Sequence, residues 1–217
     1  MVLLRKELQL ELAAKDGLPL ALAFSVVCLL TLNFALAPGQ AAEPGYSAAG
    51  LWVSVLFGSV LLFNRALLRE REAGGFLALS LSPADPGLVY LAKAAGTFLM
   101  VLGLELGTAL AAGFFFNADL ARLWGCGGAA LVLGALGLSA LGTLQAAMAV
   151  HLRPRDAVLP LLLFPLQIPI LIFGGRAVLD ALSGNQEGGL IGLAAMAGFD
   201  ILFLAAGYLL FSFLMEE

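Results

Sequence analysis

Residues 94–118 read AAGTFLMVLGLELGTALAAGFFFNA, an uninterrupted apolar stretch whose one charged residue, Glu105, lies near its centre. An α-helix rises about 1.5 Å per residue, so about 20 residues cross the hydrocarbon core of a bilayer. This stretch is long enough and apolar enough to span a membrane as a helix. A carboxylate at its centre is costly in lipid and is therefore expected to face other protein.

Outward from this stretch, charged residues separate five more segments of similar length. They are residues 17–42, 44–64, 123–150, 157–175 and 188–215. Asp200 is the only charge inside them. The chain is 61% hydrophobic and only 12% charged, whereas soluble domains are about a quarter charged. We therefore predict an all-α polytopic membrane protein, with six transmembrane helices in one transmembrane domain over residues 1–217.

The basic residues indicate the orientation. When loops are assigned alternately to the two sides, only Arg122 and Arg176 fall on one side. The other side receives Arg5, Lys6, Lys15, Arg65, Arg69, Arg71, Lys93, Arg153 and Arg155. Because cytoplasmic loops are enriched in Lys and Arg, both termini are expected in the cytoplasm. Trp52 and Trp124 then lie near the outer ends of helices two and four, where indole rings favour the headgroup region.

Two segments are expected on the cytoplasmic face. In residues 1–16, leucines every four residues predict an amphipathic helix on the membrane surface. In residues 64–93, apolar Phe76, Leu77 and Leu81 follow a charged run and are stopped by Pro83, which predicts a short helix between helices two and three. That apolar cluster fits either the groove of a partner protein or the lipid headgroups.

Glu105 and Asp200 are expected to face the interior of the bundle. Gly103 and Gly107 lie on the opposite side of their helix from Glu105, so that side should pack closely against a neighbour. The candidate hydrogen-bond partners of the two carboxylates are each other, through a shared proton, and the side chains of Asn33, Gln145 and Gln167. Two interpretations stay open: a substrate or proton path, and hydrogen-bonded packing.

The fifth and fourth helices each carry a further signal. Pro160, Pro165 and Pro169 remove backbone donors and predict a kinked or partly unwound fifth helix, either static or a moving hinge. The fourth helix is rich in glycines that permit close approach to another helix or to a second copy of the chain. These are Gly125, Gly127, Gly128, Gly134, Gly137 and Gly142.

No motif for catalysis or nucleotide binding occurs. The lysines lack the glycine-rich context of a P-loop, so any ATP is expected on a partner subunit. The single histidine, His151, lies beside Arg153 and Arg155 at the cytoplasmic end of helix four, which fits a headgroup or partner contact better than a ligand role. We expect no enzymatic activity, no metal site, no cofactor bound by this chain and no nucleic-acid partner.

The cytoplasmic segment carries the first resemblance. The pattern Glu70-x-Glu72-x-x-Gly75, followed by Leu79, Leu81 and Ser82-Pro83, resembles the loop after the second span of ABC-2 type permeases. In that family the loop contacts the ATPase subunit. The resemblance implies coupling residues in this loop, namely Glu70, Glu72, Gly75, Phe76, Leu77, Leu81 and Pro83.

A second resemblance extends over nearly the whole chain. Residues 161–173, LLLFPLQIPILIF, with Asp180 after them, are similar to the proline-rich fifth helix of the CcmB (haem exporter protein B) family. It implies a multi-pass subunit of the bacterial inner membrane in the ABC complex for cytochrome c maturation. The implied partners are an ATPase that binds ATP, haem-handling membrane proteins, a haem chaperone and a second copy of the chain, and the complex handles haem.

Two alternatives remain at this point. An ABC-2 exporter subunit for another cargo, such as a drug, lipid or polysaccharide, fits the cytoplasmic loop but fits the proline-rich helix less well. A proton-coupled secondary transporter would use Glu105 and Asp200 without an ATPase, although we find no internal repeat of the kind such carriers contain.

Overall fold

The computed structural model describes residues 17–37, 40, 43–72, 85–151 and 164–216. Nearly all of these residues are helical. The long helices are α2 (Gly17–Ala35), α3 (Pro44–Glu72), α5 (Pro86–Phe115), α6 (Cys126–His151), α8 (Ile168–Leu182) and α9 (Gln186–Glu216). Two short 3₁₀ helices, η2 (Leu120–Leu123) and η4 (Phe164–Gln167), precede α6 and α8.

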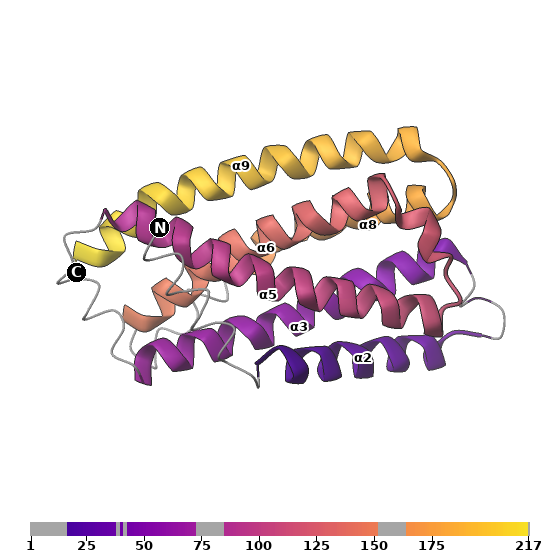
Figure 1. Ribbon diagram of the computed structural model, residues 1–217, viewed down its shortest axis with the longest axis horizontal. Helices are drawn as coiled ribbons and strands as arrows, with labels where there is room; N and C mark the ends of the chain where they lie inside the picture. The colour runs from indigo at the N-terminus through magenta and orange to yellow at the C-terminus, as the bar shows by residue number, and fades with distance from the viewer. Residues whose placement is uncertain (1–16, 38–39, 41–42, 73–84, 152–163, 217) are drawn as a thin grey trace.

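The long helices run antiparallel to their neighbours in the chain, in one elongated bundle (Figure 1). We call one end of the bundle distal: there α2, α5 and α8 end and α3, α6 and α9 begin. The opposite end, where α2 and α5 begin and α3, α6 and α9 end, is called proximal. The described parts of the chain therefore enter and leave the bundle at the proximal end, as six consecutive spans require.

Within the described ranges, six helices are long and apolar enough to cross a membrane, which confirms the predicted all-helical polytopic class. Three predicted boundaries were wrong. The first span ends at Ala35 and not at residue 42. The third span begins at Pro86, not at residue 94, because Asp85 caps the helix and Lys93 is buried within it. The fifth runs on to Leu182, past residue 175, because Arg176 and Asp180 form an ion pair one turn apart within the helix.

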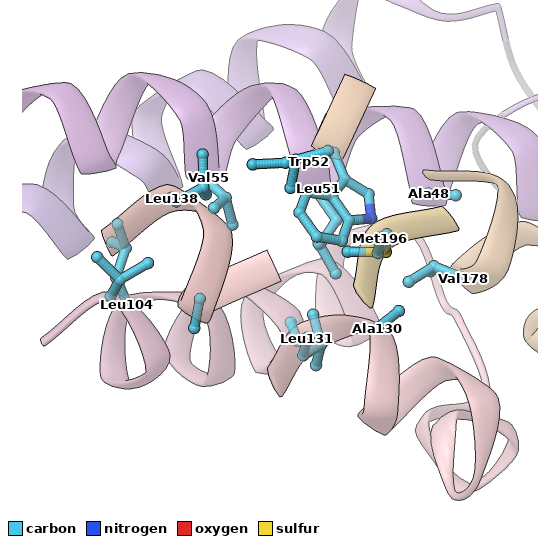
Figure 2. Close-up of a cluster of buried hydrophobic side chains, with 14 of the residues drawn as sticks. Ala48, Leu51, Trp52, Val55, Leu104, Ala130, Leu131, Leu138, Val178 and Met196 are labelled. Carbon is cyan, nitrogen blue, oxygen red and sulfur yellow. The ribbon is translucent and has the colours of Figure 1, made fainter. Parts of the chain in front are cut away.

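α6 is the central helix and packs against α3, α5, α8 and α9. The core around it includes Trp52, Leu104, Leu138 and Met196, which Figure 2 shows in one cluster. Trp52 is only 2% exposed, so its prediction as a headgroup anchor was wrong. Trp124, by contrast, is 85% exposed at the distal end.

The glycines of α6 explain how Trp52 fits inside the bundle. A Cβ at Gly134 would collide with the indole ring of Trp52, and a Cβ at Gly142 would collide with the ring of Phe63. Both glycines therefore admit an aromatic ring from α3. These two positions are used within one chain, so they give no support to the predicted contact with a second copy.

The outer helix α2 packs on α3 and α5. On α5, Gly103 lies against Leu18 and Gly107 lies against Leu22. Glu105 is buried on the other side of α5, against α6. The predicted division of this helix into a small-residue side and a carboxylate side is thus observed.

Candidate functional site

Two buried carboxylates lie against the central helix. Glu105 is 0% exposed and Asp200 is 1% exposed. A Cβ added at Gly134 of α6 would lie 3.1 Å from Oε1 of Glu105, and one added at Gly137 would meet Oδ1 of Asp200. Because Gly134 and Gly137 are one turn apart, the carboxylates of α5 and α9 lie over adjacent turns of α6, within electrostatic range of each other.

Glu105 is ten residues from the end of α5, about 15 Å from the distal end, and Asp200 is about 21 Å from that end along α9. Both depths fall within the hydrocarbon region of a bilayer about 30 Å thick. The six spans thus carry two acidic groups at membrane depth, shielded from lipid by the bundle, as predicted. A carboxyl group buried at such depth destabilises the protein unless it is hydrogen-bonded or neutral.

Neither carboxylate has a hydrogen-bond partner among the described residues. The amides predicted as partners do not bond to the carboxylates, although Nε2 of Gln145 and Oε1 of Gln167 are buried without a partner among the described residues. Asn33 Nδ2 donates to the carbonyl of Phe115 at 2.9 Å, and Gln167 Nε2 donates to Gln145 Oε1 at 3.1 Å. Among the described residues, the site is therefore a pair of buried acidic groups that bond neither to each other nor to a neighbouring side chain.

The proximal end contains a second polar contact, which joins α5 to α9. Asp85 accepts a hydrogen bond from the backbone N–H of Gly87 at 2.7 Å and one from the hydroxyl of Tyr208 at 3.3 Å. Tyr90 is fully buried beside this contact and donates from its hydroxyl to the carbonyl of Ala140 at 3.0 Å. The beginning of α5, the end of α9 and the middle of α6 are thus held together.

Most predicted coupling residues cannot be placed. α3 extends through the positions of Glu70 and Glu72 to its end, and α5 begins at Pro86, so the predicted segment 64–93 overlaps both helices. The other predicted coupling residues lie outside the described part of the chain. They are Gly75, Phe76, Leu77, Leu81 and Pro83. The predicted surface helix of residues 1–16 lies outside it as well.

The prolines of the fifth span lie at its beginning. Pro165 belongs to the 3₁₀ helix η4 and Pro169 to the first turn of α8, while Pro160 lies outside the described residues. At these positions the missing N–H removes few or no helical hydrogen bonds. The change from 3₁₀ to α geometry at Gln167 is the irregularity that this proline-rich sequence produces.

The sequence did not predict a group of hydrogen bonds at the distal end, formed by Gln186 and Arg122, which we call the distal clasp. Gln186 Oε1 accepts from the backbone N–H of Cys126 at 3.1 Å, and Gln186 Nε2 donates to the carbonyl of Arg122 at 3.3 Å. Arg122 Nη1 in turn donates to the carbonyl of Leu182 at 3.0 Å. These bonds tie the α5–α6 connection to the α8–α9 connection, and no motif in the sequence indicated a pairing across about 60 residues.

The ion pair between Arg176 and Asp180 was not predicted from the sequence either. Arg176 Nε donates to Asp180 Oδ2 at 3.2 Å; the arginine side chain is 66% exposed and that of the aspartate 9%. Their i, i+4 spacing was the available signal, because it joins opposite charges on one helical face. No group of His, Cys, Asp and Glu able to hold a metal ion occurs in the ranges that the structure describes.

Comparison with known proteins agrees with this architecture. Residues 1–210 match the family described as CcmB protein. The chain is 32% identical over 177 residues to "Heme exporter protein B" of Rhodobacter capsulatus, covering 81% of this chain and 80% of that one. It is 34% identical to the protein of that name from Paracoccus denitrificans (84% and 83% covered) and 30% identical to that from Pseudomonas aeruginosa (90% and 87%).

Proposed function

The chain belongs to the CcmB protein family, and we propose that it is the membrane permease subunit of an ABC transporter complex for cytochrome c biogenesis. The match of residues 1–210 to the family, together with relatives named as haem exporters, carries this proposal. ATP hydrolysis takes place on a separate ATPase subunit, and the complex exports haem or releases haem-loaded chaperone. The chain itself binds no cofactor and is not an enzyme.

The bacterial inner membrane is the proposed location, with both termini in the cytoplasm. This orientation rests on the excess of Lys and Arg predicted for that side and makes the proximal end cytoplasmic. Residues 1–16 then form an interfacial helix and residues 64–93 contain the coupling segment. The proposed partners are the ATPase, haem-handling membrane proteins, a haem chaperone and a second copy of the chain, since ABC transporters use two membrane halves.

A mechanical route from the ATPase follows from the packing. The coupling segment leads directly into Asp85, which caps α5 and accepts the hydrogen bond of Tyr208 on α9. A push on the segment therefore displaces the proximal ends of α5 and α9 together. The same two helices carry Glu105 and Asp200, so that displacement alters the surroundings of both carboxylates.

Purification of the tagged, full-length chain from its native membrane tests the proposal. We expect an ABC ATPase to co-purify, and a Phe76→Asp/Leu81→Asp variant to lose the ATPase because charges would disrupt an apolar docking surface. Leu110→Ala is the matched control, since Leu110 is 64% exposed on the side of α5 that faces lipid. Recovery of the wild-type chain without an ATPase would contradict the proposal.

One observation favours a second candidate function. Glu105 and Asp200 are buried without hydrogen-bond partners in the described structure, as proton-carrying residues of secondary transporters often are. Such a carrier works without an ATPase, so the same purification separates the two functions.

A further inference from the structure

An apolar groove of about 500 Å³ lies between the distal halves of α3 and α8. Gly45, Ala49 and Val53 line it on α3, and Ile172 and Leu179 line it on α8. The small side chains on α3 leave space that a larger residue would fill. The groove opens on the side of the bundle where Val53 and Ile172 are exposed, 39% and 61% respectively.

A cationic side chain forms part of this groove. Arg176 uses its Nε atom to bind Asp180, and its terminal nitrogens Nη1 and Nη2 make no hydrogen bond to any other residue that the structure describes. Arg176 is six residues before the end of α8, about 9 Å from the distal end. Its side chain extends toward the distal end as far as Asp180, two residues before α8 ends, and a long cationic side chain near a helix end reaches the boundary between acyl chains and headgroups in this way.

The indole ring of Trp52 forms part of the inner wall of the groove. The indole N–H of Trp52 is buried and has no hydrogen-bond partner among the described residues. A Cβ at Gly174 would lie 2.7 Å from Cε2 of the indole, and one at Gly175 would lie 3.8 Å from Cδ1. Nε1 lies between these two ring atoms, so α8 covers the donor edge, and only the ring of Trp52 borders the groove.

We propose that this groove is a specific binding site for a phospholipid of the membrane leaflet at the distal end. The phosphate binds the terminal nitrogens of Arg176, because a guanidinium matches the geometry of phosphate oxygens. One acyl chain lies along Ala49, Val53 and Ile172. The lipid thereby fills the apolar groove and pairs the terminal nitrogens of Arg176, which bind no other residue in the described part of the chain.

The order of these groups along the groove fits a phospholipid. Arg176 pairs with Asp180, one turn nearer the distal end, so its guanidinium lies toward the outer mouth of the groove. Trp52 is level with Gly174 and Gly175, about one turn deeper. A phospholipid presents its groups in the same order, with the charged phosphate outermost and the apolar chain deeper.

Fluorescence quenching by a brominated lipid tests the site. The chain contains two tryptophans, and Trp124→Phe leaves Trp52 as the sole indole. Trp52 lines the groove but is only 2% exposed, so a brominated chain in the groove comes closer to its ring than bulk lipid elsewhere on the bundle does. We expect phosphatidylglycerol with a brominated acyl chain, added to the detergent-solubilised full-length chain, to quench Trp52 saturably and to be displaced by unbrominated phosphatidylglycerol.

The variant and its control each remove an ion pair. Arg176→Gln/Asp180→Asn removes both charges of the pair without leaving a buried carboxylate alone, and we expect the apparent lipid affinity to fall about tenfold or more. Asp119→Asn removes one charge of the exposed Arg122–Asp119 pair outside the groove while Arg122 keeps its bond to Leu182, and it should leave the affinity unchanged. Ala49→Phe, which fills the groove, should abolish the saturable quenching.

Three results would overturn the lipid site. One is equal affinity in the Arg176→Gln/Asp180→Asn and Asp119→Asn variants, and another is equal quenching by a brominated diacylglycerol, which lacks the phosphate. The third is loss of quenching when the native complex is assembled, since a partner helix or a second copy would then cover the groove. The first two results come from the isolated chain without an ATPase, so they are independent of the proposed function.

Discussion

The ring of Tyr90 on α5 packs directly against Gly207 on α9, and the ring of Tyr208 on α9 packs against Gly87 on α5. Each helix thus supplies one tyrosine and one glycine to a reciprocal contact at the proximal end. Tyr90 also stacks obliquely on Phe211, with the ring centroids 5.7 Å apart. This contact holds α5 against α9 at the proximal end, next to the proposed coupling segment.

Gly207→Ala should destabilise the bundle. The added methyl group would collide with Cζ and the hydroxyl of Tyr90, and overpacking of this kind costs about 1–3 kcal/mol. The thermal unfolding midpoint in detergent measures the effect. Gly198→Ala in the same helix is the control, because a Cβ there meets nothing within 4 Å. Equal midpoints for the two variants would show that the tyrosine contact is loose.

Glu105→Gln and Asp200→Asn should fold and assemble normally but lose cytochrome c maturation. Neither carboxylate makes a hydrogen bond to a described residue, so the neutral amides break no such contact, whereas they cannot carry a proton. Haem staining of c-type cytochromes at matched expression levels measures the activity. Full activity in both variants would reduce the pair to packing elements.

Pro165→Ala and Pro169→Ala should change stability by less than about 1 kcal/mol, because both prolines lie at the beginning of the fifth span, where they replace few backbone donors. Thermal unfolding and maturation activity should both stay near wild type. If activity fell while the unfolding midpoint stayed constant, the 3₁₀ segment would act as a moving hinge and the static interpretation would be wrong.

Gln186→Ala should weaken the distal clasp. Its side chain accepts from Cys126 and donates to Arg122, and each such bond contributes about 0.5–1.5 kcal/mol. A lower unfolding midpoint is therefore expected. Ser212→Ala serves as the control, because that hydroxyl donates only to Leu209 within its own helix. An unchanged midpoint for Gln186→Ala would mean that water replaces the clasp.

Much of the architecture could be predicted because lipid imposes it. A bilayer offers no partners to backbone N–H and C=O groups, so an apolar stretch such as residues 94–118 has to form a helix. The burial of Glu105 and Asp200 follows from the same physics, since a carboxylate facing lipid is too costly. The span boundaries at Lys93 and Arg176 were misplaced, because burial and ion pairing allow charged residues within a helix.

The sequence by itself determined the number of helices, their membrane location and the inward position of the two acids, because these depend on local length and polarity. Only the tertiary structure decided which residues meet. Trp52 entered the core because Gly134 and Gly174 leave space for its ring, and the acids came to lie on adjacent turns of α6. Contacts of this kind depend on the shapes of side chains far apart in the chain, which no local pattern encodes.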